Sequence, residues 1–208
     1  KEREREMKDY GRNSNFMLDL ETFGKNPDSA FITLAIVQFP INLDLIGMIE
    51  KGNFSAMRSL SLDIVPHRDA TYDFSTIQWW LKQSQAARDS VCNSNGISES
   101  EVIEKLDQFM SVSLSEKPLA KKNRTVWSRG IDFDLPILKS AYLRAGMTSD
   151  EMPWNFWNSR DQRTVVNLGS RVSRKPLTWM NAHDALHDCY AQIYEILMVR
   201  KMKALRYD

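Results

Sequence analysis

The sequence predicts a single-domain α/β protein, in which strand-like and helix-like segments alternate along the chain. Its length of 208 residues is close to that of one domain and is sufficient to bury one sizeable core. Apolar runs near the N-terminus have the composition of β-strands, whereas later segments repeat apolar residues at helical spacing. Around residues 125–145 a strand-like run directly precedes a helical pattern, an order typical of α/β folds. The sequence contains no internal repeat, low-complexity linker or second core.

The first residues of the chain carry alternating charges. Residues 1–6 are Lys-Glu-Arg-Glu-Arg-Glu and have no apolar face. Such a pattern is typical of a solvated chain end. We expect residues 1–13 to form a charged, disordered leader without a functional role, and residues 14–208 to form the folded domain.

Three apolar runs that follow have the character of β-strands. Residues 16–20 are interrupted only by Asp19, and residues 30–39 are rich in β-forming side chains. Because a turn-rich segment separates these two runs, they are predicted to be adjacent strands joined as a hairpin. Residues 55–65 alternate apolar and polar side chains over most of their length and are predicted to form a third strand.

The middle of the chain contains two consecutive helical patterns. Residues 73–92 place apolar side chains at near-helical spacing and predict one helix. Ser98 and Glu101 form a capping-box pattern before the second helix, whose apolar stripe extends to Met110.

The last third of the chain combines a strand, a loop and two helices. Residues 125–127 are predicted to be a short strand, and residues 134–145 a helix that ends at Gly146. The aromatic segment 152–163 is predicted to be loop-like. Residues 182–205 have the longest helical pattern in the chain.

The composition excludes several classes of protein. With 28 Lys and Arg against 27 Asp and Glu, the chain is not a polybasic protein, so any nucleic-acid partner must be held by a local site. Cys92 and Cys189 are far apart, which supports neither a disulfide framework nor a cysteine zinc site and favours a reducing compartment. No apolar run reaches the ~20 residues of a membrane-spanning helix and no signal peptide is recognised. We expect a soluble, cytoplasmic protein with no membrane partner.

A pair of acidic residues lies within the first predicted strand. Asp19 and Glu21 are two residues apart, so they project from the same face of the strand, while Leu18 and Leu20 project from the other. A charge in a buried strand is costly unless it is paired or binds a metal. The simpler interpretation is that the strand ends here and both carboxylates are solvated.

Two further acidic residues, Asp132 and Asp134, lie between the predicted strand at 125–127 and the helix that follows. Ligands of α/β proteins gather at the carboxyl ends of strands. Each of the two is equally explained as a helix N-cap, and capping does not exclude metal binding.

The start of the last helix carries His183 and Asp188. A spacing of five residues corresponds to about 140° around a helix, so the two side chains converge only if His183 precedes the helix or lies in its first turn. Asn181 as the helix cap would allow this arrangement. A surface or core histidine without a catalytic role is the simpler interpretation, and we apply it to His67.

The joint order of these motifs resembles the DEDD exonucleases, in the subclass whose last motif carries histidine (DEDDh). The matching segments are Leu-Asp-Leu-Glu-Thr with Asp19 and Glu21, Gly-x-x-Phe-Asp-x-x-Ile-Leu with Asp134, and His-x-Ala-x-x-Asp with His183 and Asp188. Residues 77–88 and 159–164 are similar to the phage exonuclease A type and its exoribonuclease relatives. The resemblance favours Asp134 over Asp132 and implies an RNase H-like fold, a mixed β-sheet flanked by α-helices.

The resemblance implies a metal-dependent 3'-5' exonuclease that hydrolyses phosphodiester bonds and releases nucleoside monophosphates. Two Mg²⁺ or Mn²⁺ ions ~3.5–4 Å apart would stabilise the transferring phosphoryl group. Such cations prefer oxygen ligands, which Asp19, Glu21, Asp134 and Asp188 would supply. His183 would act as the general base toward the attacking water.

The implied substrate is the 3' end of single-stranded nucleic acid, with DNA favoured on the resemblance and RNA trimming as the alternative. Phe23 and Trp79 could stack on bases, Thr22 could contact the terminal nucleotide, and Arg160 and Arg163 could contact phosphate. A structural pairing of arginine with Asp161 is an equally serious interpretation. Lys121, Lys122 and Arg124 form a local basic cluster, for which a solvated loop is the simpler explanation. The expected location is the cytoplasm of a bacterial or phage-infected cell, and the oligomeric state is left open.

Two alternatives belong to other functional classes. His183 and His187 are four residues apart and could share a zinc ion on one helical face, as in a zinc hydrolase. This would leave Asp19 and Glu21 unexplained. A non-catalytic nucleic-acid-binding module is the other alternative, although all five catalytic positions of the motif set are present.

Overall fold

A mixed five-stranded β-sheet forms the centre of the molecule. The computed structural model describes residues 14–91, 95–169, 177–181 and 183–204. The strand order is β3-β2-β1-β4-β5; β1, β2 and β3 pair antiparallel, whereas β1–β4 and β4–β5 pair parallel. The strands are β1 (Ser14–Thr22), β2 (Phe31–Phe39), β3 (Arg58–Asp63), β4 (Arg124–Ser128) and β5 (Ser159–Asp161).

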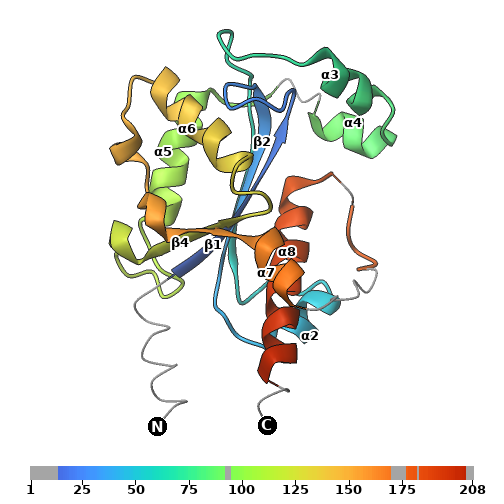
Figure 1. The fold of residues 1–208 in the computed structure, drawn as a ribbon, viewed down its shortest axis with the longest axis vertical. Helices are drawn as coiled ribbons and strands as arrows, with labels where there is room; N and C mark the ends of the chain where they lie inside the picture. The colour runs from blue at the N-terminus through green and yellow to red at the C-terminus, as the bar shows by residue number, and fades with distance from the viewer. Residues whose placement is uncertain (1–13, 92–94, 170–176, 182, 205–208) are drawn as a thin grey trace.

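Helices cover both faces of this sheet, as Figure 1 shows. α5 (Glu99–Met110) and α6 (Asp134–Arg144) lie on one face, and α2 (Leu45–Glu50) and α8 (Ala185–Ala204) lie on the other. Strand β1 serves both layers because its side chains alternate: Phe16, Leu18 and Leu20 belong to the core beneath α5 and α6, and Met17 belongs to the core beneath α8. The predicted α/β class and the hairpin of the first two strands are confirmed.

The region predicted as one helix over residues 73–92 is in fact two helices, α3 (Phe74–Leu81) and α4 (Gln85–Val91). The break has a local cause. The N–H groups of Lys82 and Gln83 bond back to Trp79 and Trp80 and close the end of α3, while Ser84 Oγ accepts a 3.2 Å bond from Ala87 N at the start of α4. Serine at this position favours a new helix start over continuation.

The segment predicted to be loop-like over residues 152–163 also contains regular structure. The edge strand β5 lies within it, and Asp161 caps the next helix, α7 (Gln162–Leu168), by accepting a 2.6 Å bond from Thr164 N. Both elements are too short to show the repeating apolar pattern from which a strand or a helix is predicted. Among the described residues there are also three 3₁₀ turns: η1 (Lys121–Asn123), η2 (Ser149–Glu151) and η3 (Phe156–Asn158).

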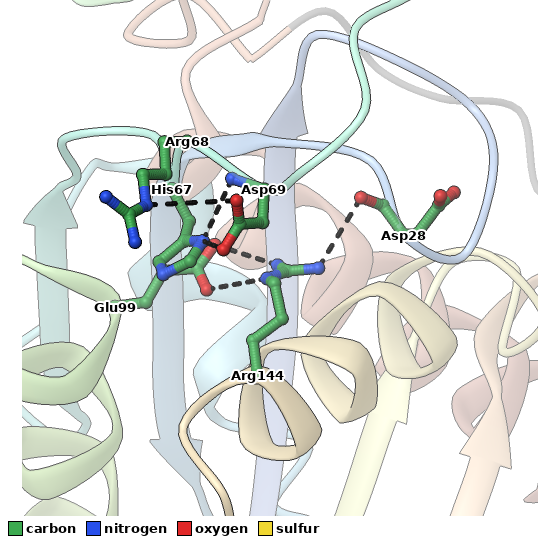
Figure 2. A network of polar contacts seen from close by, with 6 residues as sticks. All are labelled: Asp28, His67, Arg68, Asp69, Glu99 and Arg144. Atoms are coloured by element: carbon green, nitrogen blue, oxygen red, sulfur yellow. Dashed lines mark hydrogen bonds and ion pairs between the residues drawn. The ribbon is translucent and has the colours of Figure 1, made fainter.

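A buried ion pair ties α5 to α6 (Figure 2). Arg144, the last residue of α6, donates to both carboxylate oxygens of Glu99, at 3.0 and 2.8 Å, and Glu99 is only 4% exposed. Glu99 opens α5 immediately after Ser98, which forms the predicted capping box with Glu101. Arg144 also reaches the carbonyl of Asp28 in the loop after β1, so one side chain joins three segments.

Some predictions lie outside the described residues. These concern the leader over residues 1–13, Cys92 and the chain end after residue 204, so the domain boundaries remain a prediction. Cys189 is a free, buried thiol. Within the described residues, no helix combines the length and apolar character needed to cross a bilayer.

Candidate active site

Three carboxylates meet where β1 approaches α8. Asp19 and Glu21 lie two residues apart on the strand and Asp188 lies in the first turn of the helix. One ligand oxygen from each of the three lies within 4.8 Å of the others. The same-face projection predicted for Asp19 and Glu21 is therefore present, and the simpler interpretation, two solvated acids at a strand end, does not describe the structure.

A fourth carboxylate, Asp134, comes from the far side of the sheet. β4 ends at Ser128, and Gly130 then turns the chain with φ +103°, a conformation that favours glycine. The turn makes Asp134 the first residue of α6, where its side chain is 3% exposed and accepts a 3.3 Å bond from Leu20 N of β1. Asp132 in the same turn is exposed.

The interpretation of Asp134 as the N-cap of its helix is wrong. The cap position is occupied by Phe133, and Asp134 lies one residue inside the helix. Its carboxylate is instead directed to the neighbouring strand, because the parallel pairing of β1 and β4 brings their carboxyl ends to the same edge.

Burial raises the pKa of three of these carboxylates, and the charges of neighbouring acids add to the rise at Asp19 and Glu21. Burial, followed by the charges of Asp134, Glu21 and Asp188, holds the pKa of Asp19 well above its usual value. Burial and the charges of Asp188, Asp134 and Asp184 raise the pKa of Glu21 to about 8. Burial raises the pKa of Asp134 to about 7, although hydrogen bonds and the charge of Arg163 oppose the rise. A fully ionised cluster therefore needs a positive countercharge.

The donor set suits a hard divalent cation. All its ligand atoms are carboxylate oxygens, which Mg²⁺, Mn²⁺ and Ca²⁺ prefer. The ligand oxygens of Asp19, Glu21 and Asp188 are close enough to one another to coordinate the same cation. Binding a cation would also offset the repulsion that contributes to the raised pKa values of Asp19 and Glu21. Within the residues that the structure describes, no other group of three or more His, Cys, Asp or Glu side chains is arranged in this way.

One residue of this site was not predicted from the sequence. Gln192 is 2% exposed, and its Nε2 donates a 2.7 Å hydrogen bond to Asp19 Oδ1. Gln192 follows Asp188 by four residues on α8, so the two share a helix face. That spacing is the signal that could have identified it.

His183 lies just before α8, one of the two positions predicted to let it converge with Asp188, but the helix cap differs from the one predicted. Asp184, not Asn181, caps the helix: its Oδ1 accepts bonds of 3.0 Å from Leu186 N and His187 N. His183 has φ +63°, a left-handed conformation in which His and Asn are over-represented among non-glycine residues. Its ring packs edge-on against Trp79, with 4.7 Å between centroids.

A pocket of about 590 Å³ adjoins the carboxylates. Glu21 belongs both to the cluster and to the pocket wall. Thr22 lines the pocket beside it, with its hydroxyl donating a 2.7 Å bond to the carbonyl of Gly24. The remaining walls come from β1 and the loop after it, the α3 region and the turn before α6: Leu20, Gly24, Lys25, Ser75, Thr76, Gln78, Trp79, Trp80, Lys82 and Phe133.

The adjacent tryptophans of α3 divide their roles, as their adjacency on a helix predicts. Trp80 is 4% exposed and donates from Nε1 to the carbonyl of Thr22 at 2.9 Å, so it supports the pocket from within. Trp79 is 41% exposed. Its indole is therefore accessible to a ligand from the pocket.

The other predicted substrate contacts do not line this pocket. Phe23 packs against the small core that contains Trp80 and stacks on Tyr72 with 6.1 Å between centroids. Arg163 donates to the carbonyl of Arg129 at 3.4 Å, and its charge acts on the Asp134 carboxylate. Arg160 is exposed, with its guanidinium bonded to the carbonyls of residues 157 and 159.

The two histidines of the zinc alternative have different surroundings. His183 packs against Trp79 and Trp80, whereas His187 packs against Trp179 and accepts a 3.0 Å bond at Nδ1 from Asn181 N. That bond occupies one of the two ring nitrogens of His187. The geometry thus favours the carboxylate cluster as the metal site.

Comparison with known protein families agrees with this geometry. The model of the 3'-5' exoribonuclease Rv2179c-like domain matches residues 14–199. A curated exodeoxyribonuclease of Enterobacteria phage T4 is 28% identical over 213 residues, which cover 93% of this chain and 89% of the phage protein.

Comparison with solved structures shows the same fold in other nucleases. E. coli exonuclease I in complex with a dT13 oligonucleotide superposes with a TM-score of 0.61 at 15% identity over 95% of this chain. The present chain spans 43% of the length of that protein. The nuclease domain of 3'hExo, a DEDDh family member bound to rAMP, superposes with a TM-score of 0.54 at 14% identity, covering 93% of both chains.

Proposed function

Because the chain belongs to the family of 3'-5' exoribonuclease Rv2179c-like domains, and with it to the DEDDh 3'-5' exonucleases, we propose that it removes nucleotides from the 3' end of single-stranded nucleic acid, with DNA preferred. The observation that carries this proposal is the shared position of Glu21, which lies both in the carboxylate cluster and in the wall of the adjoining pocket. A 3'-terminal nucleotide in that pocket would present its phosphodiester to the carboxylates.

The cations in this proposal are two Mg²⁺ or Mn²⁺ ions, which Asp19, Glu21, Asp134 and Asp188 would hold. When bound, they supply charge stabilisation for the transferring phosphoryl group and for its attacking and leaving oxygens. Gln192 would keep the Asp19 carboxylate in one orientation through its 2.7 Å hydrogen bond.

His183 would accept the proton of the attacking water. The residue packs edge-on against Trp79 and Trp80, which line the pocket. The left-handed turn at His183 and the Asp184 cap after it place the imidazole ahead of the helix that carries Asp188. An imidazole can accept this proton near neutral pH.

Two residues of the pocket suit the terminal nucleotide. The hydroxyl hydrogen of Thr22 is given to Gly24, so its oxygen can accept a hydrogen bond from a sugar hydroxyl. The exposed indole of Trp79 offers a surface on which the terminal base can stack. Arg163 would act from outside the pocket, through its charge near Asp134.

The preference for DNA is supported by the phage exodeoxyribonuclease, which is similar to this chain over 93% of its length. RNA is the second candidate, because the family description names an exoribonuclease and the 3'hExo nuclease domain binds rAMP. A pocket discriminates the two sugars by its contacts to the 2'-hydroxyl.

Digestion of matched single-stranded DNA and RNA of one sequence, labelled at the 5' end, tests the proposal. With Mg²⁺ or Mn²⁺ we expect a ladder of shortening products from DNA and a slower ladder from RNA. Asp19→Asn is the control, because it removes one charge from the cluster without changing side-chain size. A faster RNA ladder would contradict the sugar preference, and internal cuts would contradict exonucleolytic action.

A further inference from the structure

We propose that a second surface, beside the active site, binds the nucleotides that precede the 3'-terminal one. This surface, the aromatic platform, consists of Phe156 and Trp157 together with Lys121 and Lys139. The proposal rests on the proposed function, since it assigns the platform to the same single-stranded substrate.

The platform borders a cavity of about 660 Å³ that is separate from the pocket at Glu21. The cavity has an apolar floor that includes Leu135, Met152 and Trp154. Phe156 and Trp157 rise at its edge with exposed fractions of 82% and 62%. Aromatic side chains this exposed are typical of binding surfaces, and any base can stack on them regardless of sequence.

The charge of the platform complements a phosphate backbone. Lys121 and Lys139 line the cavity, against one acid, Asp150. Lys121 Nζ donates to the backbone carbonyl of Asp150 rather than to its carboxylate, so its charge is not neutralised by that bond. Arg160 adds a third cation at this edge, since its guanidinium is bonded to the carbonyl of Trp157.

The turn before α6 contributes to the walls of both the platform cavity and the pocket at Glu21. Ile131 lines the platform cavity, and Phe133, two residues later, lines the pocket at Glu21. Two residues of chain span at most about 7 Å. The two cavities therefore approach each other at this turn, and a strand whose 3' nucleotide lies in the pocket would cross the turn on its way to the platform.

A surface of exposed aromatics could also bind a second copy of the chain. The lysines and the turn that borders both cavities favour the nucleic-acid strand. If the surface instead bound a second copy, the protein would be a dimer in solution and loss of the aromatic side chains would lower its mass. The same variants therefore distinguish self-association from nucleic-acid binding.

Kinetics on substrates of different length test the platform. Phe156→Ala, Trp157→Ala and the double variant are compared with the wild type on single-stranded 20-mer DNA and on the p-nitrophenyl ester of thymidine 5'-monophosphate, which has no preceding nucleotide. We expect kcat/KM on the 20-mer to fall about 5- to 100-fold, as loss of base stacking implies. Hydrolysis of the ester should stay within about twofold of the wild type.

Leu168→Ala is the matched control, because Leu168 is 72% exposed but does not line the platform cavity. Equal losses on both substrates, or no loss on the 20-mer, would overturn the platform. A change from dimer to monomer in sedimentation of the double variant, without loss on the 20-mer, would assign the surface to self-association instead. If the wild type degrades neither substrate, the proposed function fails. This outcome is distinct from failure of the platform, in which the wild type is active.

Discussion

Gln192 of α8 donates a 2.7 Å hydrogen bond from Nε2 to Oδ1 of Asp19 on β1, and so joins the two elements that supply the carboxylate cluster. The amide lies almost fully buried, and its Oε1 has no hydrogen-bond partner among the described residues. This amide donates a hydrogen bond to a carboxylate while its own buried oxygen accepts none, and an unsatisfied buried oxygen lowers stability. This indicates that Gln192 serves to orient Asp19.

Replacement of Gln192 by leucine should therefore weaken metal binding more than folding. Outer-sphere hydrogen bonds to metal ligands contribute about 10- to 100-fold in metal affinity or activity. We expect a loss of this size in Mn²⁺ affinity, measured by isothermal titration calorimetry. Gln38→Met is the control, since Gln38 of β2 is about equally buried but bonds the carbonyl of Val112, just after α5, and no residue of the carboxylate cluster. Equal Mn²⁺ affinities in the two variants would show that Gln192 has no positioning role.

Asp132 and Asp134 offer a matched pair for the middle motif. Asp134→Asn keeps an oxygen that can accept from Leu20 N but removes the charge near Asp19. Loss of a residue that only supports a metal ligand costs up to about 100-fold in activity. Because Asp134 is proposed to be a ligand itself, we expect turnover to fall at least about 100-fold. Asp132→Asn changes an exposed residue and should leave turnover unaltered. The measurement is release of nucleotides from labelled DNA at saturating Mn²⁺, and a loss confined to Asp132→Asn would reverse the assignment.

His183 combines a proposed chemical role with an unusual backbone conformation, and two variants separate them. His183→Asn tolerates φ +63°, whereas His183→Ala does so less readily. Both should lose about 10²- to 10⁴-fold in kcat if the imidazole is the general base. Mn²⁺ affinity should be retained in both, and only the alanine variant should show a lower Tm. Near-normal turnover in the asparagine variant would refute the general-base role.

How much of this site a sequence reveals depends on the period of each element. The alternation of residues 16–21 predicts the common face of Asp19 and Glu21, because strand geometry has a period of two and β1 is long enough to display it. Helix α8 is predicted in the same way from its length. The position of Asp134 depends instead on the parallel pairing of β1 with β4, a long-range contact that no local pattern encodes.

The short elements are where prediction fails. α2, β5 and α7 are too short to display a period, and the break between α3 and α4 depends on the bond from Ala87 N to Ser84 Oγ. Phe23 is adjacent to the acidic motif in sequence, yet it packs with the core around Trp80. Adjacency along the chain does not determine which face of the pocket a side chain reaches.

The pair of Glu99 and Arg144 should contribute to stability and not to catalysis. Arg144→Met would leave the Glu99 carboxylate buried without its cation, and breaking a buried pair in this way costs about 3–5 kcal/mol. Arg68→Met is the control from the same region, because Arg68 is exposed in its contact with Asp69 and such pairs contribute at most about 1 kcal/mol (Figure 2). Urea unfolding measures the difference. A similar loss in both variants would contradict the structural importance of the buried pair, and turnover at 25 °C should be unchanged in both.

The raised pKa values of the cluster make the stability of the metal-free protein depend on pH. The pKa of Glu21 is about 8 and that of Asp134 about 7 in the folded chain, both well above the values of unfolded carboxyl groups. Between about pH 4 and pH 8 the folded state therefore holds more protons than the unfolded state, and its stability falls as the pH rises. Below about pH 4 these carboxyl groups are protonated in both the folded and the unfolded state, and their contribution to the stability of the folded state is at its maximum.

We therefore expect the Tm in EDTA to fall from pH 5 to pH 8, and excess Mn²⁺ to reverse the fall at pH 8, because the cation stabilises the ionised cluster of the folded state. Glu21→Gln carries no titrating group at that position and should show a shallower fall in EDTA and a smaller gain from Mn²⁺. Differential scanning calorimetry of both proteins at three pH values provides the comparison. Parallel Tm curves for wild type and variant would mean that Glu21 does not experience the repulsion that its neighbours impose.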